Sequence, residues 1–159
     1  MRASAAAAAF FFASSVSALT PTDVENALKN VSIIPDDIAD FTPKALLDVT
    51  YTDSTSNQSI VISPGLPISV NQTTMRPQYA LTSSDASLTG QRFVLIMFDP
   101  DAPTPQNRSL AQVRHLVAQV QLSSDTAALA SGAGSPLTNS TPAVSDYISP
   151  GPPPGGAHR

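Results

Sequence analysis

The sequence of 159 residues predicts an all-β protein with minor helices, folded as an antiparallel β-sandwich of Greek-key type. Short apolar and β-branched runs recur along the chain with turn residues between them, as in sandwich proteins. The 15 prolines are spread out, which favours short strands and turns over long helices. With 42% hydrophobic and only 13% charged residues, the chain is apolar enough to form a core.

The N-terminal segment predicts a signal peptide at residues 1–18, followed by one domain at residues 19–159. Arg2 precedes an apolar run from Ala3 to Ala13, and small residues end at Ala18, where we place the cleavage. The run is too short to span a bilayer, so we expect no transmembrane segment. The alternative is an apolar helix of the fold or a membrane anchor. The expected location is secreted and extracellular, or vacuolar by the secretory route.

Five N-glycosylation sequons agree with the expected passage through the secretory pathway. Each fits the acceptor pattern for N-glycosylation, and cysteine is absent, so no disulfide is expected. The acceptors would be Asn30, Asn57, Asn71, Asn107 and Asn139.

A short helix is expected after residue 20, because Thr20 can cap it and Pro21 suits its first turn. Strands are then expected wherever apolar residues alternate or β-branched residues cluster. The run Phe93–Phe98 is apolar on both faces, which predicts a central strand covered on both sides. Beyond the strands we expect a helical turn at Thr126–Ala130 and a polar loop at Ser131–Ser145. The expected strands are Ala45–Tyr51, Ser59–Ser63, Ile68–Val70, Gln78–Leu81, Phe93–Phe98 and His115–Leu122.

Candidate chemistry gathers where the apolar strand meets two aspartates. Asp99 and Asp101 lie between prolines that stiffen the turn, and His115 begins the next long strand. His158 follows a Pro/Gly-rich segment that can fold back to the same end of the sheet. A histidine beside a carboxylate can donate hydrogen bonds to an anion such as phosphate. Taken alone, Asp-Pro-Asp most often forms a turn with Asx hydrogen bonding.

Other functional classes fit the sequence less well. A chain with 8 basic and 12 acidic residues is not typical of nucleic-acid binding. Two histidines and an aspartate could bind a metal ion, but no H-x-x-x-H or E-x-x-H spacing is present. A serine hydrolase would need a nucleophile elbow, and the sequence contains no G-x-S-x-G.

At these residues the sequence resembles the phosphatidylethanolamine-binding protein family. The family signature is an apolar strand, Asp-Pro-Asp-x-Pro, a small residue, ten residues and His. Here it reads Phe93–Phe98, Asp99-Pro100-Asp101-Ala102-Pro103, Thr104, ten residues and His115. The second motif is similar to Gly151-Pro152-Pro153 followed by His158-Arg159, about one residue shorter than the common animal form. Thr104 stands where Ser, Asn or Gly is usual, and Phe98 where a smaller residue is preferred.

The resemblance implies a non-catalytic binding protein without cofactor or metal. It implies that Asp99, His115 and His158 line a small anion pocket for a phosphate-bearing small molecule or phospholipid head group. Asp101 would support the turn from behind, and the walls would be Ala102, Pro103, Gly151 and Pro152.

The segments Ile33–Tyr51 and Met75–Tyr79 look like the secreted fungal branch of the family, which includes relatives of carboxypeptidase Y inhibitor. This suggests an alternative function: inhibition of a serine carboxypeptidase, or another protein interaction, through a surface outside the pocket. In the family a Tyr, a core strand and often a C-terminal helix follow His-Arg. We therefore expect a domain without its last strand and C-terminal helix, with His158 frayed and the pocket incomplete.

Overall fold

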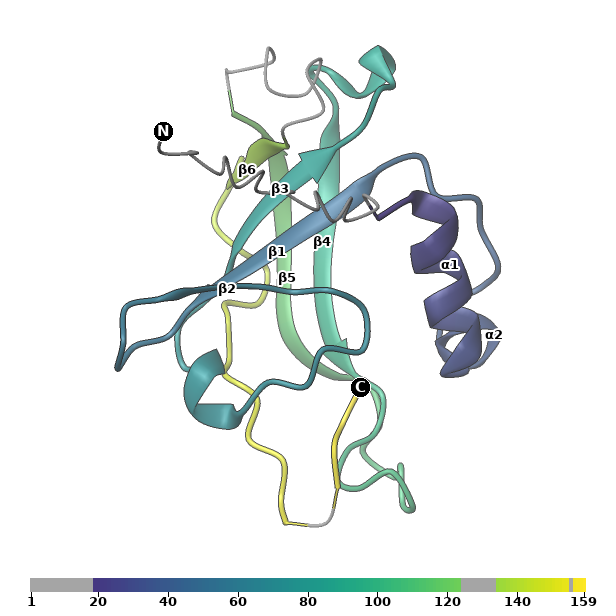
Figure 1. The fold of residues 1–159 in the computed structure, drawn as a ribbon, viewed down its shortest axis with the longest axis vertical. Helices are drawn as coiled ribbons and strands as arrows, with labels where there is room; N and C mark the ends of the chain where they lie inside the picture. Colours follow the sequence, from purple (N-terminus) through teal and green to yellow (C-terminus); the bar gives the residue numbers. More distant parts are fainter. Residues whose placement is uncertain (1–18, 124–133, 155) are drawn as a thin grey trace, which may run out of the picture.

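The computed structural model describes residues 19–123, 134–154 and 156–159, and its fold is mostly β with few helices (Figure 1). Its six strands form one antiparallel sheet in the order β2-β1-β3-β6-β5-β4. The strands are β1 Leu46–Thr52, β2 Ser59–Val61, β3 Gln78–Thr82, β4 Arg92–Asp99, β5 Val113–Leu122 and β6 Ser135–Asn139. The helices are α1 Pro21–Asn30 and α2 Ile33–Asp36, with 3-10 turns η1 Val70–Thr73 and η2 Ala86–Leu88.

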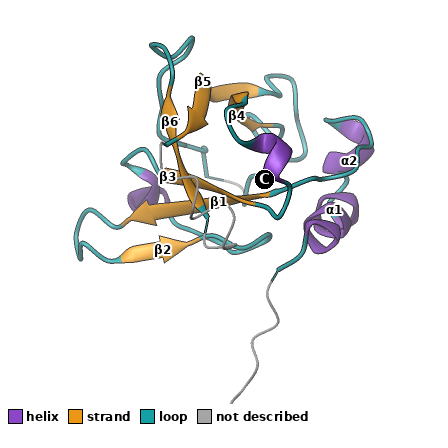
Figure 2. Ribbon diagram, turned by 90° about the horizontal axis from the view of Figure 1, so that it is seen from above, coloured by secondary structure: helices purple, strands orange, loops and turns teal. Residues whose placement is uncertain are grey.

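The sheet curls, so that β1 and β3 lie across from β4 and β5 (Figure 2). The core fills the space between these two parts of the sheet. It is formed by Tyr79 of β3, Leu95 of β4, and Leu116, Ala118 and Val120 of β5. All-β character with minor helices is thus confirmed, while a Greek-key sandwich stays a prediction.

Helix α1 begins where the sequence places it. The Thr20 hydroxyl accepts a hydrogen bond from the backbone N–H of Asp23, whose carboxylate accepts in return from the Thr20 backbone N–H. This capping box satisfies donors that the first turn would otherwise leave unpaired. Within the described residues, no helix is both long and apolar enough to cross a membrane.

Two local predictions are wrong. Ile68 and Val70 form no strand; instead the chain turns at η1, where Ser69 and Gln72 form a second capping box. The predicted loop Ser131–Ser145 contains β6, which pairs with both β3 and β5 and so joins the two parts of the sheet. The helical turn expected at Thr126–Ala130 lies outside the described residues.

The expected burial of β4 on both faces is also wrong. Leu95 is 6% exposed, but its neighbours Val94 and Ile96 are 67% and 56% exposed. Because successive side chains of a strand point to opposite faces, Leu95 packs on the core inside the curled sheet, while Val94 and Ile96 lie on the outer face, which no described residue covers.

This difference between neighbours in one strand is testable. Leu95→Ala should lower the free energy of unfolding by about 2–4 kcal/mol, because it leaves a cavity in the core. Ile96→Ala, the matched control one residue away, should cost less than about 1 kcal/mol because its side chain already faces solvent. Urea unfolding followed by circular dichroism measures both. Equal losses would contradict the assignment of the two faces.

Candidate functional site

A β-bulge positions the first histidine. In the β4–β5 ladder Met97 pairs with Leu116, but the next residue, Phe98, pairs with Arg114, so His115 is the extra residue of β5. Such bulges redirect a side chain at the end of a ladder. The His115 ring is buried, and its Nδ1 lies 2.7 Å from the carbonyl oxygen of Ile148. A carbonyl can only accept, so Nδ1 carries the hydrogen and Nε2 is left for another partner.

The turn Asp99-Pro100-Asp101 is stabilised by Asp99, which also contacts a histidine of the site. One oxygen of Asp99, Oδ1, accepts a hydrogen bond of 2.7 Å from the backbone N–H of Asp101, which is the Asx arrangement. The other oxygen, Oδ2, lies 2.7 Å from Nδ1 of His158. One carboxylate therefore fixes the turn and orients a histidine 59 residues further along the chain.

The second histidine is held in place rather than frayed, in contrast to the prediction. Its side chain is only 9% exposed. While Nδ1 bonds to Asp99, Nε2 is buried and has no hydrogen-bond partner among the described residues. A buried polar atom without a partner is costly, which points to a missing ligand or water.

Both histidines line one cavity of about 450 Å³. Its polar wall comprises Ser69, Thr73, Asp99, His115, His158 and Arg159, and most of the remaining lining is apolar. A few polar groups within an apolar lining are typical of a ligand-binding pocket. The apolar lining comes from Tyr51, Leu66, Pro67, Ile68, Val70, Met97, Phe98, Pro150, Pro152 and Ala157.

The sequence was compared with protein families. Residues 38–159 match the family described as phosphatidylethanolamine-binding protein. The chain belongs to this family. The match covers more than half of the chain and contains every strand and every residue of the polar wall.

In this phosphatidylethanolamine-binding protein family member, half of the residues predicted for the site line the cavity. Asp99, His115, Pro152 and His158 do so. Four others do not line it: Asp101, Ala102 and Pro103, which belong to the turn behind it, and Gly151. Ala102 is buried, and the Ala102–Pro103 peptide bond is cis.

The apolar wall was missed because much of it comes from a loop. The segment Leu66–Val70 has no strand pairing, and apolar loop residues carry no periodic pattern. Pro64-Gly65 was the available signal, since a turn there sends the following residues back across the sheet.

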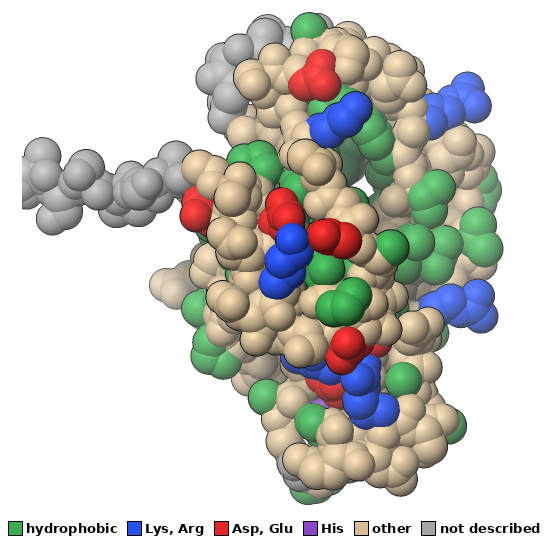
Figure 3. Space-filling model, turned by 90° about the vertical axis from the view of Figure 1, so that its right-hand side faces the viewer, with side chains coloured by type: hydrophobic (Ala, Val, Ile, Leu, Met, Phe, Trp, Pro, Cys, Tyr) green, Lys and Arg blue, Asp and Glu red, His purple; other side chains and the backbone are tan. Residues whose placement is uncertain are grey.

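Asp101 faces away from the cavity into a cluster of ion pairs. Its two oxygens accept from the Arg159 guanidinium at 2.8 and 2.9 Å, and one also accepts from the Arg159 backbone N–H at 2.8 Å. Arg108 donates to the Pro100 carbonyl at 2.6 Å and to Asp37 at 2.7 Å. Arg159 also bonds to the Val31 carbonyl, which ties the N-terminal helical region to the turn. Figure 3 shows acidic and basic side chains gathered below the helices, with a histidine just visible beside them.

These contacts lower the pKa of the Asp101 carboxyl, chiefly through the hydrogen bonds from Arg159. The Asp101 side chain is 3% exposed, so its charge depends on these partners rather than on water. Its place behind the cavity agrees with the supporting role that the resemblance implies.

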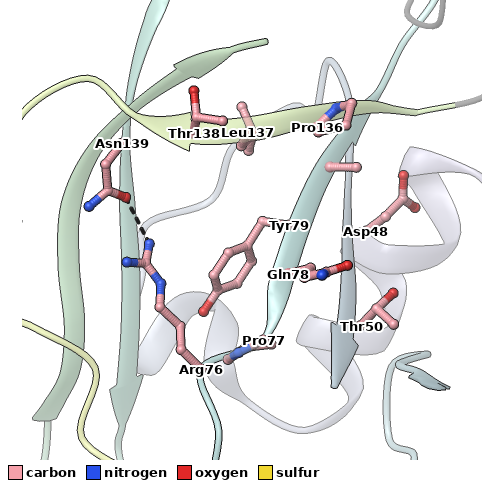
Figure 4. A pocket seen from close by; sticks show the side chains of 11 residues that line it. Asp48, Thr50, Arg76, Pro77, Gln78, Tyr79, Pro136, Leu137, Thr138 and Asn139 are labelled. Carbon is pink, nitrogen blue, oxygen red and sulfur yellow. Dashed lines mark hydrogen bonds between the residues drawn. The ribbon is translucent and has the colours of Figure 1, made fainter. Parts of the chain in front are cut away.

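A second cavity of about 620 Å³ is lined by residues of β1, β3 and β6 and by Arg76 and Pro77 before β3 (Figure 4). Its charged groups already have partners: Arg76 donates to Asn139 at 2.8 Å, and Asp48 accepts from Thr82 at 2.5 Å. The Tyr79 hydroxyl has no partner among the described residues, but burial raises the pKa of Tyr79 to about 12, so it stays neutral. This cavity offers less for an anion than the histidine cavity.

No group of three or more metal-ligating side chains occurs in the described part of the chain.

The contribution of Asp101 to stability should depend on pH. At pH 7, Asp101→Asn should lower the free energy of unfolding by about 1–3 kcal/mol, because it weakens the bonds to Arg159 and the ion pair with Arg108, whose Nε lies 3.5 Å from Asp101 Oδ1. Since the folded-state pKa lies below the ordinary value of 3.8, the unfolded chain binds protons first as the pH falls. The difference between wild type and variant should therefore shrink below pH 3.8.

Urea unfolding at a series of pH values from about 2 to about 7, which covers the titration of the carboxyl group, measures this difference in stability. The matched control is Asp146→Asn at an exposed position, which should change stability by less than about 0.5 kcal/mol. A difference that stays constant down to the acid end would contradict the role given to the Asp101 charge.

Proposed function

We propose that the protein binds a phosphate-bearing small molecule or phospholipid head group in the histidine cavity, without turning it over. The observation that carries the proposal is the buried Nε2 of His158, unpartnered among the described residues, in a cavity that His115 also lines. Family membership agrees, because phosphatidylethanolamine-binding proteins are generally non-catalytic and bind phosphate-containing ligands.

The proposed contacts follow from the hydrogen bonds that each ring has already made. His115 uses Nδ1 for the Ile148 carbonyl, and His158 uses Nδ1 for Asp99. Each ring therefore offers Nε2 to a ligand, and in the protonated ring this nitrogen donates a charge-assisted hydrogen bond to a phosphate oxygen. Asp99 balances part of the positive charge and keeps the His158 ring from rotating.

The apolar wall suits the organic part of such a ligand. Leu66, Ile68 and Met97 line the same cavity as the histidines, so a phosphate at the polar wall places its substituent against them. A phosphate monoester with a short apolar or ethanolamine-like group fits this division better than free phosphate does.

We further propose that the protein is secreted and glycosylated. The support is the signal-like segment together with the exposure of every predicted acceptor on the surface. The exposed acceptors are Asn30, Asn57, Asn71, Asn107 and Asn139. Inhibition of a serine carboxypeptidase rests on the resemblance alone and stays a prediction.

Ligand binding can be read at the two imidazole rings by NMR. Titration with phosphorylethanolamine should shift the ring signals of both His115 and His158, whereas ethanolamine should shift neither. Asp99→Asn should weaken binding about tenfold or more, because His158 loses its charged partner. Arg92→Ala, at the exposed first residue of β4, which does not line the cavity, is the control and should bind normally. If neither ring responds to the phosphate compound, the proposed pocket is wrong.

Secretion and glycosylation can be tested in a eukaryotic host. The full chain should enter the medium cleaved after Ala18, and peptide-N-glycosidase should reduce its mass. Retention of the tag-free chain inside the cells with an intact N-terminus would contradict the proposed signal peptide. An unchanged mass after enzyme treatment would separately contradict glycosylation.

A further inference from the structure

The second cavity lies where β6 leaves β3. Among the described residues these strands share two residue pairs, and the last of them joins Ala80 to Pro136. Beyond this pair β6 continues with β5 as its partner, over residues 137–139. Gln78 and Tyr79, whose side chains alternate between the two faces of β3, both line the cavity. The cavity of about 620 Å³ thus occupies the space between diverging strands and reaches residues from both faces of β3.

The Tyr79 hydroxyl lacks a hydrogen-bond partner within the described ranges, although the residue is only 8% exposed. Figure 4 shows this hydroxyl directed toward Arg76, whose guanidinium carbon lies 6.0 Å from the centre of the Tyr79 ring. Because the phenol stays neutral, it is able to donate a hydrogen bond. A buried donor without a partner indicates a missing acceptor, and a ligand oxygen at the Arg76 end of the cavity would supply one.

The two charged residues of the lining have neutral partners. Arg76 donates to the Asn139 amide at 2.8 Å, and Asp48 accepts from the Thr82 hydroxyl at 2.5 Å. Neither Arg76 nor Asp48 forms an ion pair with any residue that the structure describes. Figure 4 shows the two side chains well apart in the lining. The cavity therefore has a cationic end and an anionic end, and neither charge is compensated by an opposite one.

The spacing of the two ends corresponds to a short peptide. Asp48 pairs with Ala80, which is four residues after Arg76. Arg76 precedes a proline, which favours an extended backbone, so these four residues span about 13 Å at ~3.3 Å per residue. An extended tripeptide places its terminal ammonium and carboxylate groups about 10 Å apart, and the side chains of Arg76 and Asp48 are long enough to cover the difference.

Hydrogen-bonding side chains lie between the charged ends. Thr50 and Gln78 face each other across β1 and β3, and Thr138 of β6 also lines the cavity. The amide groups of a bound peptide lose contact with water and need such partners. Hydroxyl and amide side chains both donate and accept, as peptide groups require. A purely apolar ligand would leave these side chains unpaired.

We propose that the second cavity binds a short zwitterionic peptide of about three residues. The peptide carboxylate accepts hydrogen bonds from Arg76 and from the Tyr79 hydroxyl, and the ammonium group pairs with Asp48. The peptide amides bond to the side chains between these ends. This site is separate from the histidine cavity, because the two linings have no residue in common.

Triglycine, its C-terminal amide and its N-acetyl derivative test the proposal by NMR on the full chain. Triglycine should shift the backbone amide signals of Gln78 and Thr138 in a saturable way and leave the ring signals of both histidines unchanged. Each derivative lacks one terminal charge and should bind about tenfold more weakly. All samples carry Thr141→Ala, which removes the glycosylation pattern at Asn139 of the lining without changing a lining residue.

Conservative variants assign the two ends of the peptide. Arg76→Gln still offers an amide donor to Asn139 but has no charge, so it should bind triglycine and its C-terminal amide equally well. Asp48→Asn still offers an acceptor to Thr82, and it should instead bind triglycine and the N-acetyl derivative equally well. Tyr79→Phe removes the unpartnered hydroxyl and should weaken triglycine binding about fivefold or more without lowering stability.

Several results would overturn the proposal. Absence of saturable shifts at Gln78 and Thr138 would do so, as would equal binding of triglycine and its two derivatives. An unchanged preference in both charge variants would contradict the assigned contacts. Saturating phosphorylethanolamine should leave triglycine binding unaltered, and competition between the two would show that the peptide occupies the histidine cavity instead. Failure of phosphorylethanolamine to bind at all would contradict the proposed function but not this second site.

Discussion

The turn Asp99-Pro100-Asp101 is the constraint on which the site depends, because its two carboxylates face in opposite directions. Asp99 holds the ring of His158 at the cavity, and Asp101 holds Arg159 in the ion-pair cluster behind it. The adjacent residues His158 and Arg159 are thus each held by one of the two aspartates of the turn. This double contact orients a histidine that no secondary structure supports, since residues 156–159 belong to no helix or strand.

Of the two arginines near the site, Arg159 lines the cavity and Arg108 does not. Arg108 bonds to the Pro100 carbonyl and to Asp37, so it joins the turn to the region of α2. The buried Asp37 has a second oxygen 4.0 Å from the Arg159 guanidinium and without a hydrogen bond among the described residues. With carboxylates on both sides, the guanidinium charges are largely neutralised behind the turn. The charged and imidazole groups that line the cavity are thus Asp99, His115, His158 and the Arg159 guanidinium, which is paired with Asp101 behind the turn.

Sequence patterns predicted features that depend on local chemistry. The helix cap at Thr20 and the alternating strands β1 and β5 follow from residue type and spacing, whereas the meeting of Asp99 with His158 was expected from the family resemblance. Features decided by neighbours distant in sequence were missed. The apolar run of β4 would read the same in a central strand as at an edge, and only the sheet order distinguishes them. Similarly, Ser135–Asn139 looks like a polar loop until β3 and β5 offer it partners.

The β4–β5 ladder has a regular part, which packs on the core, and an irregular part, which carries the site, because a bulge divides it. Before the bulge, Val94 and Ile96 pair with Gln119 and Val117 in a regular ladder. After it, the register shifts by one residue, which places His115 at the cavity and brings Asp99 to the end of the strand. The shift confines the irregular geometry of the site to a short length of β5. In the regular half of β4, Leu95 pairs with Ala118 and both side chains pack in the core, so core packing fixes this half of the strand, while the turn and the bulge fix the end that carries the site.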